Sequence, residues 1–193
     1  MLPLINGAPG VGKSTLAHRY AEEHPLALII DIDSIRTHLG QWAKFEKSKR
    51  IARDLALALA RAHLLNGHEV IVPQYLGRPE FRERLQLLAH EIDVPFVEVL
   101  LTDDTVRIAQ RFRNRRAEYA STGATHPEGD LSDDAVATEV SEANDGLLRD
   151  ATRRHVTVVT ASGGADGSYR ALCTALVSIP QSESTAPRDN RGA

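Results

Sequence analysis

The sequence contains a single cysteine, Cys173, among 193 residues, so no disulfide can form within the chain. One cysteine also excludes a zinc site built on paired cysteines, and no two of the eight histidines are four residues apart. Aromatic residues make up only 5% of the chain, which disfavours a surface on which nucleic-acid bases would stack. These absences point away from a disulfide framework, a structural zinc site and a base-stacking surface.

Long apolar runs and a strong net charge are missing as well. No apolar stretch approaches the roughly 20 residues needed to cross a bilayer. The first nine residues lack the basic start and the apolar run of a signal peptide. The formal net charge of -3 provides no overall attraction to nucleic acid. We therefore expect a cytoplasmic protein without membrane contact.

Short apolar runs alternate with segments of helical periodicity along the chain. The runs at 2–5, 26–30, 70–72, 96–101 and 156–160 predict five buried strands. This alternation is typical of an α/β fold in which helices cover both faces of a parallel sheet. A helix predicted over 47–66 would bury one apolar stripe, made of Ile51, Leu55, Ala58, Leu59, Ala62 and Leu65.

The domain prediction follows from the same pattern. One domain is expected over residues 1–180, because 193 residues suffice for one core and are few for two. Residues 181–193 contain no large apolar side chain, which predicts a disordered tail.

A glycine-rich turn follows the first predicted strand. Residues 7–14, GAPGVGKS, match G-x-x-x-x-G-K-[ST] and stand between a predicted strand and a predicted helix. In this motif backbone N–H groups and the positive end of the helix face nucleotide phosphates. We predict ATP as the ligand, with Lys13 on its β- and γ-phosphates and the Ser14 hydroxyl on Mg²⁺. The predicted cradle comprises Gly7, Ala8, Pro9, Gly10, Val11, Gly12, Lys13, Ser14 and Thr15.

Acidic residues follow the second predicted strand, in the segment DIDSIR at 31–36. Since the carboxyl ends of parallel strands face one crevice, these side chains should lie near the γ-phosphate. Phosphoryl transfer needs a carboxylate that takes the proton of the acceptor hydroxyl, and Asp33 is the candidate. Asp31, closer to the strand, is the candidate ligand of Mg²⁺ or its waters. Alternatively, Asp33 is the N-cap of a short helix over 34–39.

Two motifs of other P-loop classes do not occur. The chain has Val72-Pro73-Gln74 where many P-loop ATPases place an aspartate coupled to Mg²⁺, and no N-K-x-D guanine signature is found. The cradle together with D-x-D-x-x-R resembles the small P-loop kinase group, which includes polynucleotide kinases, zeta toxins and chloramphenicol phosphotransferase. The resemblance covers about residues 2–178. It implies a three-layer α/β/α sandwich with strand order 2-3-1-4-5, Asp33 as base, and Arg36 as a residue that holds the acceptor or the transferred phosphate.

Arginines recur every four residues on the helix predicted after the fourth strand, over about 103–116. Arg107, Arg111 and Arg115 therefore share one helix face. Residues 117–131 lack periodicity and are rich in Gly, Ser, Thr and Pro, which predicts a mobile loop. This region, about 107–135, resembles the arginine-bearing lid of nucleoside-kinase-like proteins, which implies that its arginines contact the transferred phosphate. The spacing does not say which of them does so; we favour Arg111 and then Arg115, with Arg107 nearer the start of the helix. A solvated basic face is the alternative.

The acceptor is the open question. A basic stretch of Lys44, Lys47, Lys49 and Arg50 either admits an acidic substrate or is only the polar start of a helix. Our main hypothesis is an ATP- and Mg²⁺-dependent phosphotransferase that acts on a hydroxyl of a metabolite, nucleoside or antibiotic. The alternatives are a kinase of nucleic-acid ends or nucleotide sugars, and a non-catalytic nucleotide-binding switch.

Overall fold

The computed structural model describes residues 1–121 and 132–177. Its sheet contains five parallel strands in the order β2-β3-β1-β4-β5, which confirms the order that the resemblance implied. Ile5 of the central strand pairs with Pro73 on one side and Val99 on the other. The strands are β1 (Leu2–Asn6), β2 (Leu28–Ile29), β3 (Val70–Pro73), β4 (Phe96–Thr102) and β5 (Thr157–Thr160).

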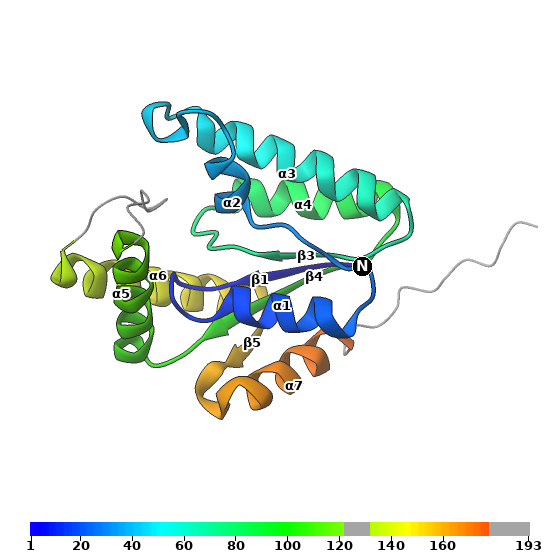
Figure 1. Cartoon of the computed structure of the whole chain (residues 1–193). Helices are drawn as coiled ribbons and strands as arrows, with labels where there is room; N and C mark the ends of the chain where they lie inside the picture. The colour runs from blue at the N-terminus through cyan, green and yellow to red at the C-terminus, as the bar shows by residue number, and fades with distance from the viewer. Residues whose placement is uncertain (122–131, 178–193) are drawn as a thin grey trace, which may run out of the picture.

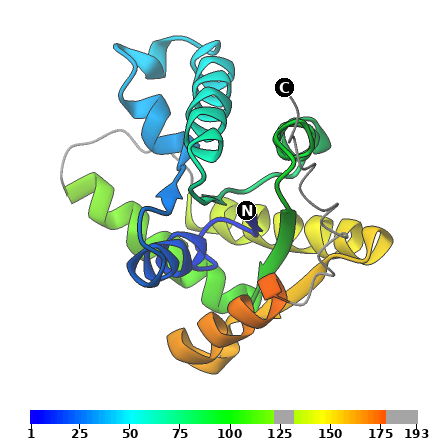
Figure 2. The same cartoon turned by 90° about the vertical axis from the view of Figure 1, so that its right-hand side faces the viewer.

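Helices cover both faces of this sheet and its carboxyl end. The α-helices are α1 (Lys13–Glu23), α2 (Ile32–Thr37), α3 (Ser48–Leu65), α4 (Pro79–Ile92), α5 (Thr105–Ser121), α6 (Asp133–Arg154) and α7 (Gly164–Val177). Helices α3 and α4 lie on one side of the sheet, and α1 and α7 lie on the other (Figures 1 and 2). Helix α5 packs against α6 beside the carboxyl ends of the strands. The fold is thus the expected three-layer α/β/α sandwich.

The two faces of the sheet bury separate apolar clusters. Successive side chains of a strand point to opposite faces, so neighbours in β1 enter different clusters. Leu4 packs with residues of α3 and α4, whereas Ile5 packs with residues of α1, α5 and α7. Each helix layer therefore has its own core. The site lies at the carboxyl ends of the strands, in the sheet between the two helix layers.

Helix α3 forms where the sequence predicted it, but the predicted buried face is wrong. Leu55 and Leu59 are 41% and 48% exposed. The buried positions are instead Ser48, Ala52, Ala56, Ala60 and Leu64. Alanines spaced four apart let α3 lie close to α2, α4 and β3, and this close packing prevails over the burial of larger leucines.

Three other boundaries differ from the prediction. The second strand is shorter, because Leu26 has a φ of 64° and is exposed in the turn after α1. Helix α2 begins at Ile32 rather than at residue 34. Helix α5 continues to Ser121, so residues 117–121 are helical and not part of a loop.

Two predicted segments, 122–131 of the loop and the tail at 181–193, lie outside the described residues. Among the helices that the structure describes, none is both long and apolar enough to cross a membrane.

Candidate active site

The glycine-rich turn forms a tight loop between β1 and α1. Gly10 and Gly12 have φ angles of 85° and 107°, which side chains other than glycine rarely adopt. Gly12 is the N-cap of α1, and Lys13 is its first residue. The Lys13 Nζ donates hydrogen bonds to the carbonyl oxygens of Gly7 and Ala8, both at 2.9 Å. The lysine is therefore held over the loop that its motif assigns to phosphates.

Close contacts join this loop to α5, the helix predicted to belong to a lid. A Cβ atom on Gly10 would lie 2.7 Å from the carbonyl oxygen of Ile108 and 2.9 Å from Cβ of Phe112, both in α5. A Cβ atom on Gly7 would lie 2.5 Å from the carbonyl oxygen of Leu101 in β4. The two glycines thus let the loop sit directly on β4 and on α5, the helix that carries Arg111 and Arg115.

Asn6 ties the same loop to the segment after β3. Its Oδ1 accepts hydrogen bonds from the backbone N–H groups of Gly7 at 2.9 Å and Leu76 at 3.0 Å. Its Nδ2 donates to the carbonyl oxygen of Leu76 and to Glu98 Oε1, both at 3.3 Å. This buried side chain fixes two segments that are 70 residues apart in the sequence.

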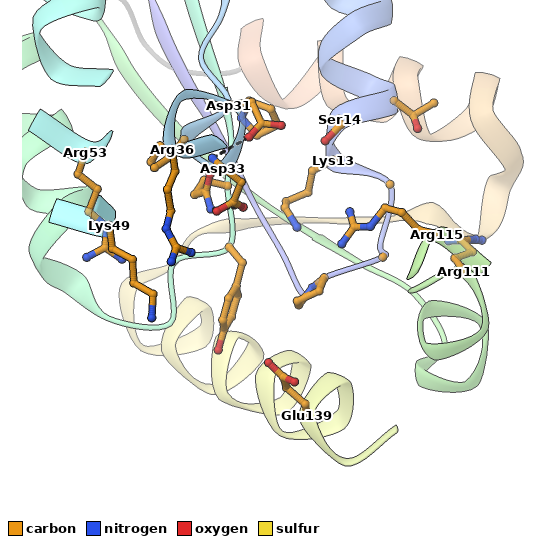
Figure 3. A pocket seen from close by; sticks show the side chains of 18 residues that line it. Lys13, Ser14, Asp31, Asp33, Arg36, Lys49, Arg53, Arg111, Arg115 and Glu139 are labelled. Atoms are coloured by element: carbon orange, nitrogen blue, oxygen red, sulfur yellow. Dashed lines mark hydrogen bonds between the residues drawn. The ribbon is translucent and has the colours of Figure 1, made fainter. Parts of the chain in front are cut away.

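A cavity of about 720 Å³ opens at the carboxyl ends of the strands (Figure 3). It is lined by Pro9, Gly10, Gly12, Lys13, Ser14, Thr15, Asp31, Ile32, Asp33, Arg36, Lys49, Arg53, Pro73, Gln74, Tyr75, Arg111, Arg115 and Glu139. Of the predicted site residues, only Gly7, Ala8 and Val11 do not line it, because they are buried in the loop. Every predicted catalytic residue reaches this one cavity.

The two aspartates after β2 have different surroundings. Asp31 is the N-cap of α2, since its Oδ1 accepts from the N–H groups of Asp33 at 2.9 Å and Ser34 at 3.0 Å. The capping role considered for Asp33 is therefore wrong. Asp33 stands in the first turn of α2 instead, and its Oδ2 accepts from Gln74 Nε2 at 3.4 Å. Because Asp31 caps the helix, the Asp33 carboxylate is not needed as a cap and lines the cavity.

Burial raises the pKa of Asp33 above the ordinary aspartate value, and the negative charge of Asp31 raises it further. The hydrogen bond from Gln74 and the positive charges of Arg36 and Arg115 oppose this shift without cancelling it. A carboxylate with a raised pKa is a stronger proton acceptor than an ordinary aspartate once it is ionised.

Arg36 is fixed beside Asp33 by the start of α3. It is only 7% exposed, and its Nε donates to Ser48 Oγ at 2.9 Å. The guanidinium also lies over the Trp42 ring, 4.7 Å from the ring centroid. Ser48 Oγ in turn donates to the Trp42 carbonyl oxygen. These contacts hold the Arg36 head group rigidly at the cavity wall.

Two of the three arginines predicted on the lid face reach the cavity. Arg111 and Arg115 line it, whereas Arg107 does not. Asp103, whose side chain is fully buried after β4, pairs with Arg111 at 2.8 Å and with Arg107 at 3.8 Å. Arg115 lies against the Phe112 ring, with its guanidinium carbon 5.1 Å from the ring centroid. Of the three arginines on this helix face, Arg107 therefore lies outside the cavity, and Arg111 and Arg115 lie at its wall.

A model of the family described as "AAA domain" matches residues 2–131, which is more than half of the chain. The chain belongs to this family. No curated protein matches the sequence of this AAA domain.

Solved structures with little sequence identity share the fold of the AAA domain. A protein of Chloroflexus aurantiacus assigned as a kinase matches at a TM-score of 0.62 and 14% identity, over 90% of this chain and 95% of that one. The PezAT toxin–antitoxin system of Streptococcus pneumoniae matches at 0.60 and 13%, over 91% and 76% of the two chains. A tunicamycin resistance protein of Deinococcus radiodurans matches at 0.55 and 18%, over 93% and 98%. These likenesses show the fold, which is that of small P-loop kinases, and ATP binding is typical of such proteins.

The residues of the AAA domain fit a nucleotide with Mg²⁺. Ser14 and Asp31 line the same cavity as Lys13 and could supply the protein's share of the ion's oxygen ligands. The described residues contain no group of three or more metal-ligating side chains. This donor set suits Mg²⁺, which takes few protein ligands and keeps water and phosphate oxygens for the rest.

Sequence reasoning did not assign several residues of the cavity, among them Arg53, Tyr75 and Glu139. Arg53 follows Lys49 by four residues, so the helical period could have placed both on one face of α3. Tyr75 follows the end of β3 by two residues, so its place at a strand end was a signal for it. No signal in the sequence could have found Glu139, because only the packing of α6 brings it to the cavity.

We expect replacement of Asp33 by asparagine to stabilise the AAA domain at neutral pH. Because the pKa of Asp33 is raised on folding, its ionised form costs stability above that raised pKa. The cost vanishes below the unfolded value, about 4, where both states bind the proton. Thermal unfolding of Asp33→Asn should therefore show a higher Tm at pH 7 and no gain near pH 3.5. An equal Tm difference at both pH values would contradict the shift.

Proposed function

We propose that this AAA domain is an ATP- and Mg²⁺-dependent phosphotransferase that acts on a hydroxyl group of a small molecule. The observation that carries the proposal is the position of Asp33. Its carboxylate shares one cavity with Lys13 of the phosphate loop and with Arg111 and Arg115 of α5 (Figure 3). An acid–base group, a phosphate cradle and cationic side chains are the three requirements of phosphoryl transfer to an alcohol.

The binding roles follow from where each group stands. The backbone of the loop and Lys13 hold the phosphates, and Ser14 and Asp31 hold Mg²⁺ or its waters. ATP, when bound, supplies the γ-phosphoryl group and leaves as ADP.

The chemical role falls to Asp33 and the arginines. Asp33 accepts the proton of the acceptor hydroxyl as that oxygen forms its bond to phosphorus and the bond to the ADP oxygen breaks. Gln74, hydrogen-bonded to Asp33, orients the carboxylate. Arg111 and Arg115 balance the negative charge of the group in transit.

A screen for acceptor-dependent ADP formation tests this proposal. The wild-type protein with Mg²⁺-ATP is incubated with hydroxylated metabolites, nucleosides, antibiotics and 5′-hydroxyl oligonucleotides, and products are identified by mass spectrometry. We expect one small-molecule class to raise ADP formation and to gain a phosphate. Lys13→Met should abolish both signals, because the cradle loses its charge on the β- and γ-phosphates.

The screen also separates the alternatives. Transfer to oligonucleotides alone would favour a kinase of nucleic-acid ends. Tight ATP binding without transfer to any acceptor would contradict the proposal and favour a nucleotide-binding switch.

A further inference from the structure

One face of helix α3 is apolar although it is exposed. The helical period places six apolar side chains on this face, and no charged residue interrupts them. We call this face the outer stripe; it consists of Ile51, Leu55, Ala58, Leu59, Ala62 and Leu65. Ile51 is half-buried and the other five residues are exposed, Leu65 to 65%. This is the stripe that the sequence pattern predicts to be buried, and no element that the structure describes covers it.

The outer stripe points away from the rest of the molecule. Helix α3 lies at the periphery, and α4 and the sheet are on its inner side (Figure 1). Arg53, which lines the cavity, precedes Leu55 by two residues and is therefore about 160° away around the helix. Lys49, which also lines the cavity, is about 120° away by the same count. A partner on the outer stripe would thus not cover the side of α3 that faces the cavity.

Single apolar side chains on a surface are common and need no explanation. Leu26 in a turn, Val106 on α5 and Val158 on β5 are exposed in this way, each on a different element. The outer stripe differs from them because its residues follow one another along a whole helix. The exposed side of a surface helix ordinarily carries polar residues, so a continuous apolar stripe indicates a face that another element covers.

The spacing of the outer stripe is that of a helix that packs along another helix. Ile51, Leu55, Ala58, Ala62 and Leu65 are separated by four, three, four and three residues, which is the seam of a two-helix pair. If two copies of α3 lie antiparallel about the middle of Ser48–Leu65, Leu55 of one copy faces Ala58 of the other. Ile51 then faces Ala62. Each large side chain meets a small one, which lets the two helices approach closely.

The charges beside the stripe favour the same orientation. Asp54 and Arg61 occupy equivalent positions one heptad apart, on the edge of the stripe where they pair with Arg84 and Glu91 of α4. In an antiparallel pair this edge meets the same edge of the second copy with its ends reversed, so Asp54 of each copy faces Arg61 of the other. A parallel pair would set them beside Leu59 and Asn66, which offer no opposite charge. Exposed charges of this kind contribute little energy, but they select the orientation.

The rest of the chain has few side chains that would fill the stripe. In the segments 122–131 and 178–193 the only large apolar residues are Leu131 and Ile179. A second copy, in contrast, brings a stripe of the same length with the matching order of large and small residues.

We propose that the protein forms a twofold-symmetric dimer in which the outer stripes of two α3 helices pack antiparallel. The same surface is then buried on both copies, as a closed twofold interface requires. The 18 residues of α3 span about 27 Å. A single helix of this length covers less than the roughly 800 Å² that each partner contributes to a standard interface. We therefore expect an exchanging dimer with a Kd on the order of 10 μM.

Sedimentation velocity of the full-length protein tests for the dimer. We expect the weight-average sedimentation coefficient to rise from the monomer value toward the dimer value between about 1 and 300 μM, on either side of the expected Kd. A monomer over this whole range would overturn the inference.

Ala62→Glu tests whether the outer stripe is the interface. Ala62 is exposed and glutamate is a good helix former, so the monomer should keep its Tm at low concentration. The new charge would face Ile51 of the second copy, and we expect Kd to rise at least 10-fold. Val106→Glu is the matched control, since Val106 is an exposed apolar residue on α5, and it should leave Kd unchanged. An unchanged Kd in Ala62→Glu, or an equal rise in both variants, would overturn the inference.

Disulfide cross-linking tests the orientation. In a Cys173→Ala background, Ile51→Cys and Ala62→Cys are prepared separately, one of them with a tag that changes its mass, and are oxidised alone and mixed. In the antiparallel pair residue 51 faces residue 62, whereas two copies of residue 51 are about 16 Å apart along the helix, too far for a disulfide. We expect cross-linked dimers only in the mixture, and all of them with one tag. Cross-linking of each variant with itself would show a parallel pair and overturn the proposed arrangement.

Discussion

Replacement of Asp33 by asparagine is expected to lower kcat for phosphoryl transfer by about 10²- to 10⁴-fold while ATP affinity stays within about twofold. An asparagine of the same shape keeps the hydrogen bond to Gln74 but cannot accept a proton, and general base catalysis is worth about this much. Acceptor phosphorylation under saturating ATP, together with calorimetric ATP binding, measures the two effects separately.

The pH profile of transfer by the wild-type protein provides a second measure of the same group. Because burial and Asp31 raise the pKa of Asp33, its loss of activity on acidification should begin above the usual aspartate range near pH 4. Glu139→Gln is the control, since Glu139 is a carboxylate of the same cavity on a different wall. Comparable activity in Asp33→Asn and wild type would place the base elsewhere.

Replacement of Gly10 by alanine should cost about 2–5 kcal/mol of unfolding free energy and strongly reduce transfer. Two causes add: a φ of 85° is strained for alanine, and the new Cβ overlaps the α5 backbone at Ile108 and the Phe112 side chain. Urea denaturation measures the first effect, and hydrogen exchange of the α5 amides reports whether the helix is displaced.

Gly12→Ala is the matched control for this substitution. Gly12 also has a positive φ, but nothing lies within 4 Å of the position its Cβ would take. It should therefore show strain without faster exchange in α5. Equal exchange in α5 for the two variants would show that the loop and the lid helix are not coupled through Gly10.

Local signals in the sequence predicted much of this site. The phosphate loop and the presence of a helix after it were predicted from one motif, and α1 does begin within that motif, at Lys13. The five strands were predicted from apolar runs, although their order came from a resemblance and not from the runs themselves. Asp33, Arg36, Arg111 and Arg115 were predicted as site residues, and all four line the cavity.

Other features depend on contacts between distant segments. Asp31 and Asp33 are equally good capping residues by type, and only the start of α2 decides between them. Helix α3 has two overlapping apolar faces, one of leucines and one of alanines, and hydrophobicity alone favours the wrong one. The contacts of Asn6 with Leu76 and Glu98 span 70 and 92 residues, for which one sequence offers no signal.

The alanine face of α3 offers a way to change the shape of the cavity without altering the side chains that line it. With only a methyl group at positions 52, 56 and 60, the distance between α3 and the sheet is set by the backbone. A larger residue at any of them would move the whole helix outward, and Lys49 and Arg53 with it. Mutations on the buried side of this helix could thus reshape the cavity while Asp33, the phosphate loop and the basic side chains of the cavity keep their identity.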